Sequence, residues 1–315
     1  MPIINNIILS NGVELPPIGY GTGVVRKYSR NKLLFIKSNL RPILSTVKHF
    51  KLNKQLKMDI FASKIIKNAY NSGIKLFDSG RIYGYSEKFI GNALNGINRE
   101  TFSIVTKVSD MDIERSVSPN TVEGNLADSL RYLRSDYVDC YLLHWAHGNW
   151  VNIYLDMEKM YKSGKAKSLG VCNFAISDFE ILAKRCTVWP HVCQTELHPF
   201  NSKPQLQLYC REHSIALMAH TPTGRMCEKI VNNEVLRSIA QKYNKTIAQI
   251  IIRWHVQNQI IPIIATVSKN HMVENLNIFD FELSTNDMAN IQSLDENYVI
   301  LKSNGIDNPK YIYNL

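Results

Sequence analysis

Apolar residues recur along this chain at two spacings. Short runs of apolar and β-branched residues predict buried strands, and longer stretches with apolar residues at every third or fourth position predict amphipathic helices. The predicted strands cover residues 18–23, 75–77, 102–108, 137–144, 166–171, 191–196, 215–219 and 260–265. The predicted helices cover residues 60–71, 86–94, 119–133, 151–163, 177–185, 204–213, 234–243, 246–257, 271–278 and 285–294.

Eight strand–helix units follow one another from residue 18 onward. Strands that alternate with helices predict a parallel sheet with right-handed crossovers, and eight units favour a closed (β/α)8 TIM barrel of the α/β class over an open sheet. No GxGxxG sequence follows the first strand, which argues against a Rossmann domain. Before the first unit, residues 7–15 predict a β-hairpin, because Asn11-Gly12 favours a tight turn. We expect residues 1–315 to form a single barrel domain.

The positive charge is concentrated in one segment. The chain has 37 basic and 27 acidic residues, a net charge of +10. Residues 24–57 contain ten Lys or Arg and no Asp or Glu, so the rest of the chain has no net charge. This segment follows the first predicted strand, and we expect it to be a basic insertion at the face of the barrel where strands end and active sites lie.

Three roles for residues 24–57 remain open. The segment can form a rim that attracts an anionic substrate, a solvated insertion without a specific partner, or a contact with a membrane surface or another protein. We do not expect a nucleic-acid partner, because the chain has no recognisable nucleic-acid-binding motif and positive charge is a weak signal without one.

Other bulk features point to an intracellular protein. No apolar run approaches the ~18 to 20 residues of a membrane span, and the first residues lack the pattern of a signal peptide. The six cysteines have no metal-binding spacing, and most lie in apolar stretches. We therefore expect free thiols in a reducing compartment, a cytoplasmic location and no bound metal.

Four ionisable side chains that can take part in acid–base chemistry lie at or just after the ends of three consecutive predicted strands. Asp78 ends the second strand and Tyr83 follows it, Lys107 ends the third and His144 ends the fourth. A single lysine at such a position is usually solvated, and a single histidine is usually a hydrogen-bonded core residue. Four such groups, expected together at the end of the barrel where the strands finish, are harder to explain by chance. An Asp and a Lys buried there would be costly unless they form an ion pair.

These residues lie in segments that resemble the signatures of the aldo-keto reductase family. Asp78 to Gly84 resembles its Asp-x4-Tyr-Gly signature, and Thr106-Lys107 and Leu142 to Trp145 resemble the next two. Further resemblances lie at Leu169 to Phe174 (Gly-Val-Ser-Asn-Phe in the family), Gln194 to Pro199 (Gln-x-Glu-x-His-Pro) and Thr246 to Trp254. The resemblance covers nearly the whole chain apart from the basic segment and the tail, residues 295–315.

The resemblance implies an NAD(P)H-dependent reductase of an aldehyde, ketone or sugar carbonyl. Nicotinamide delivers a hydride to the carbonyl carbon, and Tyr83 gives a proton to the oxygen. A free phenol has a pKa of about 10, and the Lys107 cation is expected to lower it. Asp78 pairs with Lys107, His144 orients the carbonyl, and Trp145 forms a wall of the substrate pocket.

The resemblance also implies which residues hold the cofactor, expected to be NADP. Asn173 and Gln194 bind the nicotinamide carboxamide, since each amide offers a donor and an acceptor. Glu274 and Asn275 contact the adenine. The other implied cofactor-binding residues are Gly21, Thr22, His220, Thr266, Lys269 and His271.

Three positions in or next to this set depart from the family pattern. His220 stands where the family often has a Tyr stacked on the nicotinamide, and Cys172 replaces a Ser. His271 takes the place of an Arg that, in many members, binds the 2′-phosphate of NADPH. Lys269 can compensate with charge but without a bidentate guanidinium, so NAD remains an alternative cofactor.

Two other functions remain open from the sequence. The chain can be a nicotinamide-binding regulatory or scaffold protein with a degenerate barrel, or a non-redox sugar enzyme that uses NAD as a transient hydride store. The intact set of Asp78, Tyr83, Lys107 and His144 favours catalysis, because a binding protein has little need of all four. The substrate itself depends on residues 145–150, 222–231 and 297–315, loops and a tail that fold class does not specify.

Overall fold

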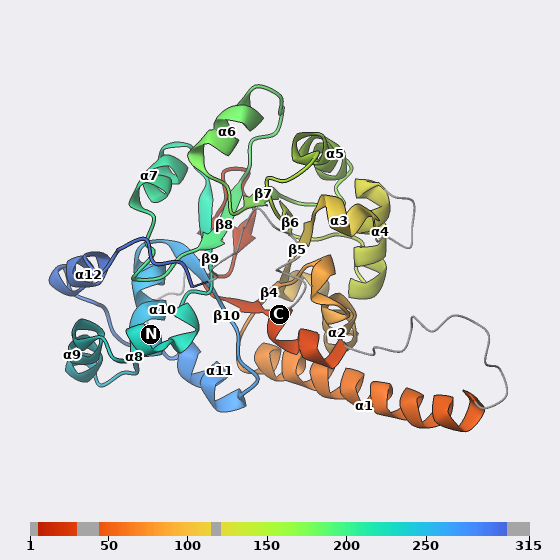
Figure 1. The fold of residues 1–315 in the computed structure, drawn as a ribbon, viewed down its shortest axis with the longest axis horizontal. Helices are drawn as coiled ribbons and strands as arrows, with labels where there is room; N and C mark the ends of the chain where they lie inside the picture. The colour runs from red at the N-terminus through yellow and green to blue at the C-terminus, as the bar shows by residue number, and fades with distance from the viewer. Residues whose placement is uncertain (1–5, 30–43, 115–120, 301–315) are drawn as a thin grey trace.

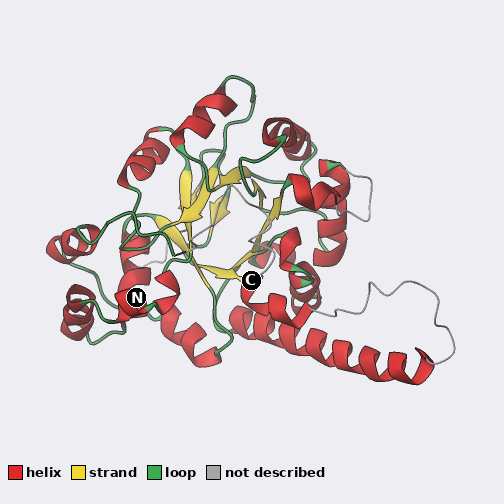
Figure 2. Ribbon diagram, viewed as in Figure 1, coloured by secondary structure: helices red, strands yellow, loops and turns green. Residues whose placement is uncertain are grey.

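Eight parallel strands form a closed barrel in the computed structural model, which describes residues 6–29, 44–114 and 121–300. Figure 2 shows the strands at the centre and the helices around them. Each strand pairs with the next along the chain, and the last pairs with the first. In this order the strands are β3 (Gly19–Gly21), β4 (Leu76–Asp78), β5 (Ser103–Val108), β6 (Cys140–Leu143), β7 (Leu169–Cys172), β8 (Val192–Glu196), β9 (Ala216–His220) and β10 (Ile260–Ile264). The predicted (β/α)8 barrel is confirmed.

The predicted N-terminal hairpin is also present. Strands β1 (Ile7–Ile8) and β2 (Glu14–Leu15) pair antiparallel, and Gly12 adopts a φ of 83° in the turn. Leu9 and Leu15 are buried in one cluster with barrel residues such as Leu76, at the start of β4. Burial of these leucines attaches the hairpin to the interior of the barrel.

Helices of the amphipathic type predicted above cover the barrel wall. Buried side chains of the helices and the outward-facing strand residues form the larger of two apolar clusters. The helices are α1 (Leu44–Asn71), α2 (Ser86–Ala93), α3 (Asp110–Glu114), α4 (Val122–Leu133), α5 (Trp150–Lys162), α6 (Ile176–Ala183), α7 (Pro204–Glu212), α8 (Glu228–Val231), α9 (Glu234–Tyr243), α10 (Ile247–Gln257), α11 (Lys269–Leu276) and α12 (Thr285–Gln292). Short 3-10 helices are η1 (Thr22–Ser29), η2 (Arg81–Tyr83), η3 (Arg99–Thr101) and η4 (Gly224–Met226).

The largest difference from the predicted elements is α1, which begins at Leu44 rather than at residue 60. The residues from 44 to 71 contain no Gly or Pro and are rich in Lys, with several Leu, and both residue types favour helix. The helix therefore extends into the basic segment. Figure 1 shows the N-terminal half of α1 projecting beyond the ring of helices. The basic segment is therefore divided between η1 and α1, and its residues 30–43 lie outside the described part of the chain.

Local capping explains where two other helices begin. The helix predicted over residues 119–133 begins at Val122, because Thr121 accepts a hydrogen bond from the Gly124 amide at 3.0 Å. Helix α10 begins with a reciprocal pair, in which Thr246 and Gln249 each bind the other's backbone amide. Within the described residues, none of the helices has the length and apolar composition needed to cross a bilayer.

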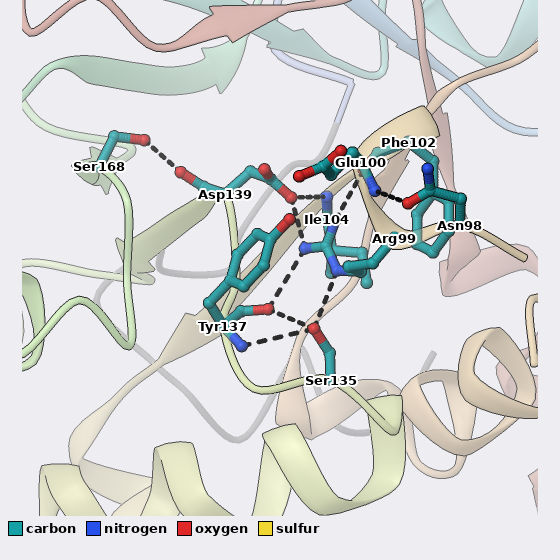
Figure 3. Close-up of polar contacts among 9 residues, drawn as sticks. All are labelled: Asn98, Arg99, Glu100, Phe102, Ile104, Ser135, Tyr137, Asp139 and Ser168. Carbon is teal, nitrogen blue, oxygen red and sulfur yellow. Dashed lines mark hydrogen bonds and ion pairs between the residues drawn. The ribbon is translucent and has the colours of Figure 1, made fainter.

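Arg99 joins the beginnings of β5 and β6. Its guanidinium donates to the Asp139 carboxylate at 2.5 Å and to the Phe102 carbonyl at 2.6 Å, and its Nε donates to Ser135 at 2.8 Å. The same carboxylate accepts from the Ile104 amide at 2.8 Å, as drawn in Figure 3. This half-buried network lies at the end of the barrel where the strands start, so we assign it to stability.

Candidate active site

A cavity of about 900 Å³ opens at the end of the barrel where the strands finish. Its walls include Asp78 at the end of β4, Gln194 in β8, His220 at the end of β9 and Ile264 at the end of β10. Functional sites of this fold gather at that end of the barrel. The volume is near the upper end of the usual range for ligand pockets, which suits a large cofactor together with a small substrate.

The four predicted catalytic residues lie together at one end of this cavity. Asp78, Tyr83 and His144 line it, and Lys107 lies behind them with no exposed surface. The Lys107 ammonium donates to the Asp78 carboxylate at 2.5 Å and to the Ser79 carbonyl at 2.7 Å. It lies 5.3 Å from the centroid of the Tyr83 ring. The buried lysine is thus an ion-paired cation directly behind the phenol.

The electrostatics of Tyr83 differ from the prediction. Lys107 does lower the pKa of the phenol, as expected, but removal of the phenol from bulk water has the larger effect. The pKa is raised to about 12 rather than lowered below its usual value. At neutral pH, Tyr83 therefore keeps its proton. Burial alone would lower the pKa of Lys107, but the Asp78 carboxylate more than offsets this and keeps the lysine charged.

His144 is a neutral hydrogen-bonding group in this setting. Burial, and then the nearby Lys107 cation, hold its pKa well below the usual value. Its ring stacks on Trp145, with centroids 3.5 Å apart and planes inclined by 14°. The Tyr83 ring meets it edge-on at 6.0 Å. Trp145, the predicted pocket wall, lines the cavity, and the stacking fixes the orientation of the imidazole.

Two amide side chains next to this group are arranged to bind a third amide. The Asn173 oxygen is engaged by Nε2 of His220 at 2.8 Å, and the Gln194 nitrogen donates to Asp78 at 2.9 Å. The Asn173 nitrogen and the Gln194 oxygen have no hydrogen-bond partner among the described residues, and both residues line the cavity. They leave one donor and one acceptor, which is the complement of a carboxamide.

The other cofactor-binding predictions separate into two groups. One group lines the cavity from the loop after β10 and from α11: Thr266, His271, Glu274 and Asn275. Gly21 also lines the cavity. Thr22 does not; it is buried, and its hydroxyl donates to the Asp78 carbonyl at 2.9 Å. Lys269 is exposed and is not among the lining residues. Thr22 is thus placed to support the Asp78 backbone.

Three lining cations were not predicted as site residues: Arg26 in η1, Lys203 before α7 and Arg225 in η4. Lys203 and Arg225 both adopt a φ of 53°. The pKa of His220 is lowered to about 4, mainly by burial, and both cations lie close enough to contribute to the lowering. Lys203 and Arg225 follow predicted strands in loops, and this sequence position could have marked them as candidate site residues. Arg26 was recognised as part of the basic segment, but its orientation was not predictable.

The beginning of the C-terminal tail closes one side of the cavity. The amide of Tyr298 donates to the Phe200 carbonyl at 2.8 Å, and the amide of Ile300 donates to the Glu196 carboxylate at 2.6 Å. Val299, between them, lines the cavity. Of the residues 297–315 on which the substrate was expected to depend, Val299 thus lies at the cavity, and residues 301–315 lie outside the described chain.

Comparison with known proteins supports the family suggested by the sequence. The model of the aldo/keto reductase family matches residues 50–296. The chain belongs to the aldo/keto reductase family. It is 35% identical over 294 residues to the glyoxal reductase of Bacillus subtilis (strain 168), covering 93% of each chain. It is 34% identical to the methylglyoxal reductase DkgA of Escherichia coli O157:H7, over 73% of this chain and 83% of the relative.

A solved structure gives the same result for the fold. An aldo-keto reductase from a Medee basin deep-sea metagenome library superposes with a TM-score of 0.78 at 29% identity, covering 96% of this chain and 100% of that one. The predicted family and enzyme class are confirmed, and the chain is an NAD(P)-dependent oxidoreductase that acts on carbonyl groups. The family match begins inside the basic segment, so most of residues 24–57 fall outside it.

Proposed function

We propose that this protein reduces a small aldehyde or ketone with NADPH and that Tyr83 is the proton donor. The observation that carries the proposal is the buried Lys107–Asp78 pair behind Tyr83, in a cavity that His144 also lines. Burying two charges costs several kcal/mol per ion unless they are well paired. This cost is comparable to the whole free energy of unfolding of a typical domain. A fold that needed the pair only for stability would do as well with apolar residues.

The residues of the cavity fit a nicotinamide dinucleotide. The open donor of Asn173 and the open acceptor of Gln194 match its carboxamide. Lys203 and Arg225, which line the cavity near His220, would hold the diphosphate. Thr266, His271, Glu274 and Asn275 would hold the adenosine end. The cofactor supplies the hydride that is transferred to the carbonyl carbon.

Side chains of the protein then neutralise the negative charge that develops on the carbonyl oxygen. Tyr83, protonated at neutral pH, donates to the carbonyl oxygen and releases its proton as that oxygen becomes negative. Lys107 stabilises the resulting phenolate, and Asp78 keeps the ammonium in position. Neutral His144 offers a second hydrogen bond that orients the carbonyl.

The proposed substrate class is a small carbonyl compound such as glyoxal. Two relatives carry the names glyoxal reductase and methylglyoxal reductase, and Trp145 and Val299 line the same cavity as Tyr83. Preference for NADPH follows the family, although a histidine at position 271 offers the 2′-phosphate less charge than an arginine.

The test is a titration followed by a turnover assay. Quenching of protein fluorescence by NADPH and by NADH gives the two dissociation constants, and loss of NADPH absorbance with glyoxal gives the rate. We expect tighter binding of NADPH and carbonyl-dependent oxidation. Binding without turnover of glyoxal or other small carbonyls would indicate a regulatory role instead, and binding of neither nucleotide would contradict the proposal.

A further inference from the structure

Glu87 is a buried carboxylate that connects the segment carrying Tyr83 with the strand carrying Lys107. It lies in the first turn of α2 and is 1% exposed. One of its oxygens accepts from the Thr106 hydroxyl at 2.6 Å, and the other accepts from the Arg81 guanidinium at 3.1 Å. Thr106 directly precedes Lys107 in β5. Arg81 is the first residue of η2, and Tyr83 is the last. One side chain therefore joins both segments.

The carboxylate reaches β5 from outside the barrel. Successive side chains of a strand point to opposite faces, so Thr106 faces α2, whereas Lys107 points inward to Asp78. Helix η2 packs against both β5 and α2. The Lys107 ammonium lies 5.3 Å from the centroid of the Tyr83 ring. This separation depends on how η2 is held against β5, which is what the two hydrogen bonds of Glu87 determine.

Stability alone does not explain why an ion pair is buried at this point. The side chains of Arg81 and Glu87 are 13% and 1% exposed. Arg81 also lies 3.7 Å from Asp128 and 5.2 Å from the centroid of the Tyr132 ring, both in α4. Apolar side chains of similar volume often stabilise a fold as well as a buried ion pair does. A network of directional hydrogen bonds, in contrast, holds its members in fixed relative positions.

We propose that Glu87 is a positioning residue that, through Thr106 and Arg81, sets the place of the Lys107 cation relative to Tyr83. This inference rests on the proposed function, because it concerns the same proton transfer. Glu87 is not among the residues that line the cavity, so it acts through its partners rather than on the substrate. If the cation moved back by about 2 Å, its attraction for the phenolate would fall by roughly a quarter.

The experiment removes the Thr106 hydroxyl, because Thr106→Val keeps the shape of the side chain. Single-turnover rates of glyoxal reduction by the preformed protein–NADPH complex are compared for wild type, Thr106→Val, Thr106→Ser and Glu87→Gln. Fluorescence titration gives the dissociation constant for NADPH, and urea denaturation gives the free energy of unfolding. Arg99→Met is the matched control, because it breaks a charge-assisted hydrogen bond at the opposite end of the barrel.

We expect Thr106→Val and Glu87→Gln to lower the rate about 3- to 10-fold and to leave the dissociation constant for NADPH unchanged. Thr106→Ser keeps the hydroxyl and should recover most of the rate. Arg99→Met should lose stability without losing rate. In a Lys107→Met background, Thr106→Val should have no further effect on the rate, because the cation on which it acts is absent.

Wild-type rates in both Thr106→Val and Glu87→Gln would overturn this assignment. So would a fall in rate that Arg99→Met shares at equal loss of stability, or one of the same size with and without Lys107, since both indicate a purely structural role. If Thr106→Val does not fold, Glu87→Gln takes its place in each comparison. A wild-type protein that binds NADPH but does not reduce glyoxal contradicts the proposed function itself, so the two failures are distinguishable.

Discussion

Replacing Lys107 by Met separates the two roles of the buried ion pair, in folding and in catalysis. The change keeps an unbranched side chain of nearly the same length and removes the ammonium that Asp78 contacts at 2.5 Å. Removing one partner of a buried pair costs about 3 to 5 kcal/mol, because the remaining charge has no counterion. Gln194 still donates to Asp78 at 2.9 Å, so we expect the lower part of this range.

The loss of activity should come from the missing charge behind the phenol. At 5.3 Å from the Tyr83 ring centroid, and with an effective dielectric constant of about 20, a unit charge stabilises a phenolate by about 3 kcal/mol. This is an upper value, since Asp78 has the opposite effect on Tyr83. About 3 kcal/mol corresponds to a fall in kcat of roughly a hundredfold.

The double variant Asp78→Asn/Lys107→Met is the matched control. It removes both charges, so the free energy of unfolding, measured by urea denaturation, should recover most of what Lys107→Met loses. The rate of carbonyl reduction should not recover. Recovery of kcat in the double variant, or an unchanged kcat in Lys107→Met, would refute the assignment of Lys107 as the cation that stabilises the phenolate.

Two further predictions concern pH and stability. Because the pKa of Tyr83 is about 12, kcat/KM for reduction should stay level through pH 10, where an ordinary phenol of pKa about 10 loses its proton. It should also show no histidine limb near pH 6.5, since His144 stays neutral there; a rate profile with either limb would contradict these assignments. Arg99→Met should lower the free energy of unfolding by about 1.5 to 3 kcal/mol, the value of one charge-assisted hydrogen bond. It should leave KM for glyoxal unchanged, and a changed KM would mean that this network reaches the active site.

The barrel and the grouping of its four candidate catalytic residues were predictable because both depend on periodicity. A strand that ends at Asp78, another at Lys107 and a third at His144 must bring those residues to one mouth once eight parallel strands close, and the structure places them there. The predicted strand boundaries differ from the observed ones by a few residues. Such errors do not move a strand-end residue from one face of the barrel to the other.

Features that depend on tertiary environment were not predictable in the same way. The sequence places a lysine near Tyr83, but the degree of burial decides whether the pKa rises or falls. The cavity cations Lys203 and Arg225 lie in loops with left-handed backbone conformations that no periodicity signals. Lys269 belongs to a segment that matches the family, yet it is exposed and is not among the residues that line the cavity.

The structure of the basic segment was likewise not predictable from the sequence. Its charge is evident from composition, but the division into η1 beside the cavity and a projecting α1 is not. Leu56, Ile60 and Phe61 are more than half exposed on α1, and a contact of this helix with a membrane or another protein stays a prediction.

The central claim is that Tyr83 gives the proton during carbonyl reduction, and Tyr83→Phe tests it most directly. The measurement pairs fluorescence titration with NADPH and the single-turnover rate of glyoxal reduction by the preformed protein–NADPH complex. We predict an unchanged dissociation constant for NADPH and a rate lowered at least a hundredfold, in the range of about 10²- to 10⁴-fold that general acid catalysis supplies. A variant that binds NADPH normally and reduces glyoxal at the wild-type rate would contradict the account.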